Sequence, residues 1–298
     1  MREPTGLVSI ACTILATLAG TAPAQVAGAP DAPAAIEWHA DYAKAMSLAR
    51  EQHMMLLIFF HKATPDAAQR AFEGKSLVTS VVGPRQDRYI WVRLPLAAKI
   101  KVQGVEHKVL DSAAFQDMRG RPGLAIIDFE NPGTANFGYV VSQFPFSAGH
   151  YYTPGSLSVI LDLPPGTLTQ RTMIFAVRSH PENPGSATGK LNGVLVGEAE
   201  SHSRYQAQIA IQGHHSWETR FHRINARMPQ SLIAQEVVAE SWPGEELVDA
   251  AIECVHSWRR SPGHWSAVRA RQPLFAFDMK RARNGIWYAT GLFANRRH

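Results

Sequence analysis

Histidine and glutamate side chains in the C-terminal half of the chain have the types and spacing to do chemistry. His214 and His215 follow Gly213 directly, Glu236 lies in an Ala-Gln-Glu-Val-Val-Ala run, and His264 ends a Trp-Arg-Arg-Ser-Pro-Gly-His run. Imidazole and carboxylate groups bind Zn²⁺ and are also the usual general acids and bases. Adjacent side chains rarely reach one point, so only one of His214 and His215 is expected to serve.

An amphipathic helix is predicted to lead into His264. Apolar residues recur there at helical spacing and would form one buried stripe. This stripe consists of Leu247, Ala251, Cys254 and Trp258. The following Ser261-Pro262-Gly263-His264 predicts a tight turn, with proline at the second position and a glycine of positive φ at the third. The turn would project His264 from a rigid support, and it also allows Ser261 and His264 to act as a nucleophile–base pair.

In this order, the motifs and the Gly-aromatic run at residues 285–293 resemble the CAP superfamily of cysteine-rich secretory, antigen 5 and pathogenesis-related proteins, in its bacterial, SCP-like form. The resemblance covers residues 168 to about 295, and its most specific part is Trp-x-x-Ser-Pro-Gly-His. Two departures stand out. Gln-Glu-Val-Val-Ala replaces the family's Gly-Glu-Asn-Ile-Ala, and Ser261 stands where many members have a second glutamate.

The CAP resemblance implies an α-β-α sandwich with a cleft lined by histidines and acidic groups. The cleft residues carried over are His214, His215, Glu236, Ser261 and His264. A zinc set of His215, Glu236 and His264 follows from it, with His214 as a replacement for His215 and water as the fourth ligand. Glu240 would replace Glu236 if the register slipped by one helical turn.

The N-terminal half predicts a mixed α/β sheet covered by helices, because strand and helix patterns alternate along it. Helices are expected at 40–52, 65–72, 110–118 and 156–163, and strands at 54–60, 89–94, 124–129 and 137–144. Over residues 36–163 this order resembles the thioredoxin fold. The resemblance is carried by Trp38, the Leu-Leu-Ile-Phe-Phe strand and Arg121-Pro122-Gly123. It implies that Pro122 is cis.

Dithiol exchange is excluded by the residues present. Where thioredoxins carry Cys-x-x-Cys, this chain reads His61-Lys62-Ala63-Thr64-Pro65 and has no sulfur. Beyond Cys12 the chain has only Cys254, so no intramolecular disulfide forms once residues 1–24 are removed. Cys254 lies on the apolar stripe and is interpreted as a buried small hydrophobe. A thiol-redox or chaperone function is therefore disfavoured.

The chain is divided into five expected segments. Residues 1–24 are a signal peptide with an Ala-Pro-Ala cleavage site, the alternative being a retained anchor. Residues 25–35 are a flexible lead-in. A redox-inactive thioredoxin-like domain (36–163), a Pro-Pro-Gly linker (164–167) and a CAP domain (168–298) follow. No segment after the signal is expected to cross a bilayer, so the protein is expected to be exported, to the periplasm or the outside.

Charge is concentrated in the second half. Residues 26–165 carry 13 basic and 13 acidic side chains, whereas residues 166–298 carry 16 and 11, so the net +5 arises there. An exported basic surface favours an anionic envelope polymer or lipid as partner, or a protein. Nucleic acid is disfavoured, since no reading motif occurs.

These observations favour a non-catalytic exported module that binds an envelope glycan, lipid or protein partner, with a zinc site as an option. The alternative is a metal-dependent hydrolase that uses the His-Glu-His cleft with metal-bound water.

Overall fold

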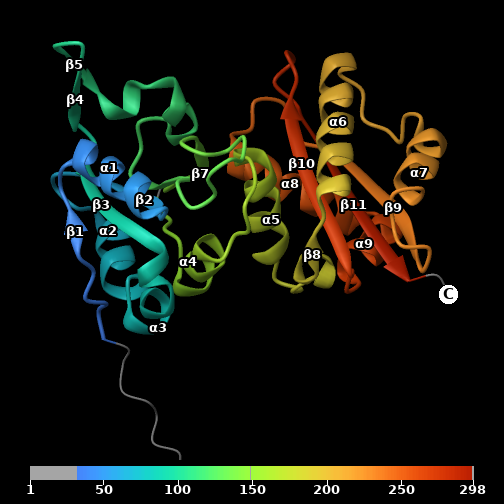
Figure 1. The fold of residues 1–298 in the computed structure, drawn as a ribbon, viewed down its shortest axis with the longest axis horizontal. Coiled ribbons are helices and arrows are strands. Elements are labelled where there is room, and N and C mark those ends of the chain that lie inside the picture. Colours follow the sequence, from blue (N-terminus) through green and yellow to red (C-terminus); the bar gives the residue numbers. More distant parts are fainter. Residues whose placement is uncertain (1–31, 148, 297–298) are drawn as a thin grey trace, which may run out of the picture. The chain divides into compact units, whose positions relative to one another are not determined.

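The computed structural model describes residues 32–147 and 149–296 of the 298-residue chain. The expected signal peptide, its cleavage site and the first part of the lead-in lie outside these residues. The described chain is mixed α/β, as predicted, with two larger sheets and a separate hairpin (Figure 1). From Ala32 onward it forms one compact unit.

The N-terminal sheet is built on the buried apolar run 55–60. Its five strands are β1 (Trp38–His39), β2 (Met55–His61), β3 (Tyr89–Pro95), β6 (Gly123–Ile127) and β7 (Val140–Pro145), in the order β1-β3-β2-β6-β7. The first three are mutually parallel, and β6 and β7 are antiparallel to their neighbours. Strand β2 is buried on both faces, which explains its lack of alternation.

Short helical segments surround this sheet. The α-helices are α1 (Tyr42–Gln52), α2 (Ala67–Ala71), α3 (Thr79–Val82) and α4 (Pro154–Leu161). The remaining turns are η1 (Phe72–Ser76), η2 (Gly83–Arg88), η3 (Val109–Asp111) and η4 (Ala113–Met118). The helix expected at 110–118 is thus two 3₁₀ segments. Asp66 caps α2, because its carboxylate accepts from the Gln69 N–H at 2.9 Å.

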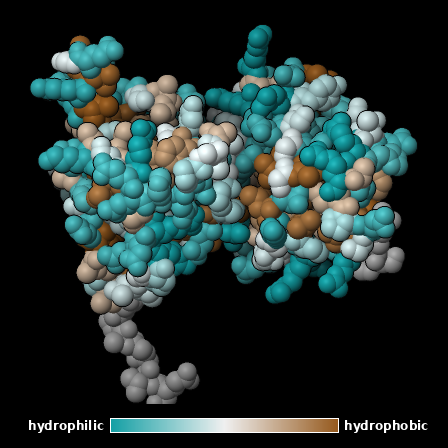
Figure 2. Space-filling view, in the orientation of Figure 1, coloured by the Kyte–Doolittle hydropathy of each residue, from teal (hydrophilic) through white to brown (hydrophobic). Residues whose placement is uncertain are grey.

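The β4–β5 hairpin, formed by β4 (Lys99–Val102) and β5 (Val105–Lys108), stands apart from both larger sheets. Gln103 and Gly104, at its tip, both have positive φ. Val102 and Val105 are exposed there, and Figure 2 shows their hydrophobic surface among hydrophilic side chains at the upper left.

Pro122 is trans, so the prediction of a cis proline is wrong: no described residue has a cis peptide bond. The chain reverses before β6 through Arg119 and Gly120, which both have positive φ. The Arg121 N–H then closes the turn onto the Met118 carbonyl at 2.9 Å. The Pro122 carbonyl accepts from the Phe146 N–H at 2.7 Å. Two left-handed residues make the reversal that a cis bond would otherwise make.

The C-terminal sheet has four strands. They are β8 (Lys190–Leu191), β9 (Leu232–Glu240), β10 (Leu274–Arg281) and β11 (Trp287–Arg296), in the order β8-β10-β11-β9. The predicted hairpin at Asn284-Gly285 is confirmed, since β10 and β11 pair antiparallel and Gly285 has φ +82. Glu236 and Glu240 lie on a strand, so the slip by one helical turn does not arise.

Helices cover both faces of this sheet (Figure 1). The covering segments are α5 (Leu168–Arg178), η5 (Gly185–Thr188), α6 (Gly193–Ile209), α7 (Trp217–Asn225), α8 (Leu247–Arg260) and α9 (Pro262–Arg269). Alternate strand residues face opposite ways. Ala276 and Leu292 pack with α6 and α7, whereas Phe275, Phe277 and Phe293 pack with α5, α8 and α9. The result is three layers, helix, sheet and helix.

The segment 164–167 lies against buried structure. One hydrophobic core includes Phe144 of β7, Phe175 of α5 and Trp258 of α8. Arg171 of α5 is fully buried and donates to the carbonyls of Leu163 at 3.1 Å and Pro164 at 2.9 Å. The division into two domains at this segment stays a prediction. In the described part of the chain, no helix is both long enough and apolar enough to cross a membrane.

Candidate functional site

A hydrogen-bonded chain of four side chains lies at strand β9. The Glu236 carboxylate accepts from Arg220 through both oxygens, with the Nη2–Oε1 bond at 2.9 Å. His214 Nδ1–H donates to the same Oε1 at 2.9 Å. His214 Nε2 lies 3.3 Å from His264 Nε2. Because the carboxylate requires a proton on Nδ1, neutral His214 has Nε2 as an acceptor, and His264 is the donor of the last bond.

The position of β9 explains how these residues meet. It is an edge strand, so elements from both helical layers reach it. Arg220 comes from α7, while His264 comes from the first turn of α9. His214 precedes α7, in a loop held by α6. The Gly213 N–H donates to Gln206 Oε1 at 3.1 Å, and the Gly213 carbonyl accepts from His202 Nε2 at 3.0 Å. Both backbone polar groups of Gly213 are held, which orients His214.

His215 does not join the site. Its Nε2 donates to the Ile211 carbonyl at 3.2 Å, and its ring packs edge-on against Tyr205 with centroids 5.6 Å apart. The preferred zinc set of His215, Glu236 and His264 is therefore not assembled, whereas the replacement residue His214 lies beside Glu236. Glu240, which lies four residues after Glu236 on β9, is exposed.

His264 is presented by a helix instead of a tight turn, so that prediction is wrong. Ser261 ends α8 and Pro262 opens α9 at once, with the Trp265 N–H bonded to the Ser261 carbonyl at 2.8 Å. Proline at a first helical position has its φ preset and loses no helical hydrogen bond. Gly263 keeps a negative φ within this helix. No hydrogen bond joins Ser261 to His264 among the described residues, so the nucleophile–base pair is not formed.

The site combines a buried negative charge at Glu236 with two imidazoles, His264 and His202, whose pKa burial lowers. Burial raises the pKa of the Glu236 carboxyl, but hydrogen bonds from Arg220 and His214 outweigh it and hold that pKa below its usual value. Burial lowers the pKa of His264, and the neighbouring His214 adds to the effect. Burial also lowers the pKa of His202 to about 4, against the opposing attraction of Glu236. At neutral pH, Glu236 is ionised and His202 is neutral.

The buried His202 makes folding stability pH-dependent. Its pKa is near 6.5 in the unfolded chain and about 4 in the folded protein, so the unfolded state binds more protons between these values. The contribution of neutral His202 to the free energy of unfolding is therefore fully present above pH 6.5. It is lost as the pH falls towards 4, and the loss amounts to about 3 kcal/mol. We expect urea unfolding at pH 7 and pH 4.5 to show this loss, and His202→Gln to reduce it. An equal pH dependence in His202→Gln would contradict the assignment.

The separation of the His214 and His264 imidazoles fits two ligands of a zinc ion. Two ligands on tetrahedral zinc, each about 2.0–2.1 Å from the metal, lie about 3.3 Å apart, which matches the His214–His264 separation. Glu236 is engaged by Arg220 and orients His214 as an outer partner does in carboxylate–histidine–zinc sites. Across residues 32–147 and 149–296, no group of three or more His, Cys, Asp or Glu side chains is placed to hold a metal ion.

Arg220 and His202 had no assigned role in the sequence analysis. His202 is 3% exposed and Arg220 is 6% exposed, so both belong to the buried part of the site. The signal available for Arg220 was its position close to His214 and His215 in the sequence. A buried glutamate needs a counter-charge, and Arg220 is a positive charge near these candidate residues. Sequence separation alone did not pair it with Glu236.

Comparisons with known proteins add little to this geometry. No protein-family model matches the chain, and no curated protein matches it. Among solved structures, the chain is similar to an outer surface protein from Borrelia burgdorferi, at 20% sequence identity over 37% of this chain and 78% of that one, with a TM-score of 0.30. A similarity of this size carries no argument about fold or function, so the resemblances to CAP and thioredoxin proteins stay predictions.

Proposed function

We propose that the protein is an exported, non-catalytic binding module of CAP type that binds an anionic envelope partner and uses the His214–His264 imidazole pair as a ligand contact. The observation that carries the proposal is the engagement of Glu236. Its carboxylate has Arg220 on both oxygens and His214 on one, and its side chain is 1% exposed. A carboxylate held in this way orients His214 and is not free to activate water.

The imidazole pair is the accessible end of the site. The His214 side chain is 44% exposed, whereas the residues behind it are buried. His214 and His264 would hold a Zn²⁺ ion between their Nε2 atoms, and the metal would supply a Lewis-acidic contact for a donor atom of the partner. With two imidazoles from the chain, the remaining positions would be open to water or that partner.

Exposed arginines support an anionic partner. Arg259 and Arg260 are paired with Glu182 and Glu253, so part of the basic C-terminal charge is already neutralised. Five further arginines of this C-terminal stretch are exposed, and no ion pair involves them in the described part of the chain. They are Arg269, Arg271, Arg281, Arg283 and Arg296. Unpaired positive charge attracts phosphate-rich polymers and anionic headgroups, and salt screens the attraction.

A hydrolase is the second candidate, favoured by the orientation of His214. Its Nδ1–H is fixed by a carboxylate, as in a general base held by an acidic partner, and its Nε2 accepts from His264 at the exposed end of the site. In this alternative His214 takes a proton from water or a substrate hydroxyl, and His264 contacts the reacting group.

One experiment separates the two functions. The purified protein is sedimented with phosphatidylglycerol or phosphatidylcholine vesicles at low and high salt, and its turnover of a p-nitrophenyl ester panel is measured with and without Zn²⁺. We expect binding to the anionic vesicles alone, weaker at high salt, and ester hydrolysis at the background rate. Ester turnover that disappears in His214→Ala would establish the hydrolase function instead. Equal binding to the two kinds of vesicle would rule out an anionic partner.

A further inference from the structure

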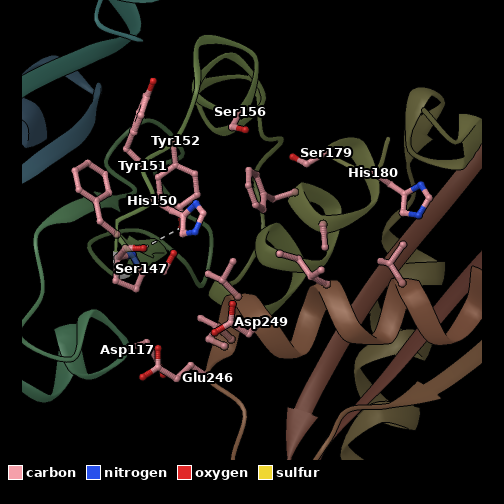
Figure 3. Close-up of a pocket in the computed structure, with 18 of the residues that line it drawn as sticks. Asp117, Ser147, His150, Tyr151, Tyr152, Ser156, Ser179, His180, Glu246 and Asp249 are labelled. Carbon is pink, nitrogen blue, oxygen red and sulfur yellow. Dashed lines mark hydrogen bonds between the residues drawn. The ribbon is translucent and has the colours of Figure 1, made fainter. Parts of the chain in front are cut away.

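A cavity of about 290 Å³ lies away from the histidine site (Figure 3). It is lined by residues 145–147 and 150–152, which lie at the end of β7 and between β7 and α4, by the end of α5 and by the first turns of α8. None of the residues of the His214–Glu236–His264 chain lines it. Its volume is near the lower end of the range of about 300–1,000 Å³ for small-molecule sites, so it suits a small ligand better than a stretch of polypeptide.

Aromatic rings form one wall of the cavity. Phe146 and Tyr152 have ring centroids 6.1 Å apart, and Tyr152 and Phe175 have centroids 5.8 Å apart, so the three rings are continuous. The Tyr152 hydroxyl is already used, since it donates to the Pro145 carbonyl at 3.2 Å. The wall therefore presents ring faces and edges, which suit apolar groups and cations.

Carboxylates gather at one end of the same cavity. Asp117, Glu246 and Asp249 lie close together at the bottom of Figure 3. Arg121 also lines the cavity and is paired with Glu246, which leaves three negative charges against one positive charge. Glu246 and Asp249 lie at the start of α8, where the helix dipole stabilises negative charge.

Three histidines also line the cavity. Burial lowers the pKa of His180, whose ring packs on Trp265 with centroids 4.8 Å apart. His256 is exposed and lies 3.8 Å from Glu253, and His150 is exposed. Counted over the Asp, Glu and Arg side chains that line it, the cavity has a net negative charge in a chain of net charge +5.

Asp117 lies at the carboxylate end of the cavity. Within residues 32–147 and 149–296, no hydrogen bond or ion pair engages its carboxylate. Burial raises the pKa of Asp117, which Arg119 and Arg281 oppose from a distance and Glu246 reinforces. A cationic group beside Asp117 would stabilise its ionised form, as a counter-charge does for a partly buried carboxylate.

We propose that this cavity binds a small organic cation, an ammonium group carried on an aliphatic or aromatic body. The apolar body lies against Phe146, Tyr152 and Phe175, and the ammonium group lies at the carboxylate end beside Asp117 and Asp249. The site is separate from the imidazole pair and does not depend on the function proposed for it.

Three probes of one shape test the proposal. Phenethylamine is cationic, 2-phenylethanol is its neutral counterpart, and 3-phenylpropanoate is anionic. We expect titration calorimetry on the full protein at pH 7 to show phenethylamine binding about tenfold or more tighter than 2-phenylethanol, and no binding of the anion. Equal affinity for the amine and the alcohol, tighter binding of the anion, or no binding of phenethylamine would each overturn the proposal.

Matched variants place the binding in this cavity. Asp117→Asn and Asp249→Asn keep side-chain size and remove one charge each, so each should weaken phenethylamine about tenfold and leave 2-phenylethanol unchanged. Asp87→Asn is the control, because Asp87 is exposed and does not line the cavity. Unfolding curves verify that the variants are folded, and an unchanged affinity in both cavity variants would refute the assignment of the site.

Discussion

Replacing His214 or His264 by alanine is expected to abolish stoichiometric zinc binding, whereas His215→Ala is expected to retain it. The Nε2 atoms of His214 and His264 lie 3.3 Å apart, but the His215 ring is bonded to the Ile211 carbonyl. Losing one of two imidazole ligands should weaken zinc by about a hundredfold or more, because open positions are then filled by water alone. Competition with a chromophoric chelator measures the affinity of each purified variant.

His215→Ala is a matched control for His214→Ala, because it removes the same side chain from the neighbouring position. A general effect of losing a histidine, or of disturbing the loop, would therefore appear in both variants. Glu236→Gln should lower zinc affinity by about 10–100-fold, the usual effect of losing an outer partner of a ligating histidine. Zinc retained in both His214→Ala and His264→Ala, or lost in His215→Ala, would show that the metal is held elsewhere.

The second large effect is expected on folding stability, from the Arg220–Glu236 ion pair. The side chains are 7% and 1% exposed, so removal of either partner leaves a charge buried without its counter-charge. Arg220→Met and Glu236→Leu should each lower the free energy of unfolding by about 3–5 kcal/mol. The double variant should cost less than the sum of the two, because no unpaired charge remains. Urea unfolding of the four proteins measures the cycle.

An exposed ion pair on α6 supplies the control for this cycle. Arg204 pairs with Glu200, and their side chains are 59% and 33% exposed. Arg204→Met should therefore cost about 1 kcal/mol or less. If Arg220→Met cost no more than Arg204→Met, the Glu236 carboxylate would have to be neutral or hydrated in the folded protein, and its role in orienting His214 would fail with it.

Several elements were predictable from the sequence because their determinants are local. The continuous apolar run of β2 requires burial on both faces, and the stripe ending at Trp258 requires one buried face of α8. Asn284-Gly285 supplies the positive φ of a hairpin. In each case neighbouring residues along the chain determine the conformation, and tertiary packing agrees with them. The candidate residues Glu236 and His264 were also named from the sequence.

Tertiary structure decided what local pattern left open. Pro262 is compatible with a turn or with the first position of a helix, and α9 forms because Trp265 is buried against His180. Pro122 is trans because Arg119 and Gly120 already reverse the chain.

The choice between the paired histidines required contacts between segments far apart in the sequence. His202 and Gln206 of α6 hold the carbonyl and the N–H of Gly213, and this turns His214 towards Glu236. Arg220 could be paired with Glu236 only after α7 and β9 were side by side. By itself the sequence determined the mixed α/β class, the absence of a Cys-x-x-Cys motif and the residue types of the site. Which of those residues meet was decided by packing, because hydrogen bonds and ion pairs depend on position in space and not on separation along the chain.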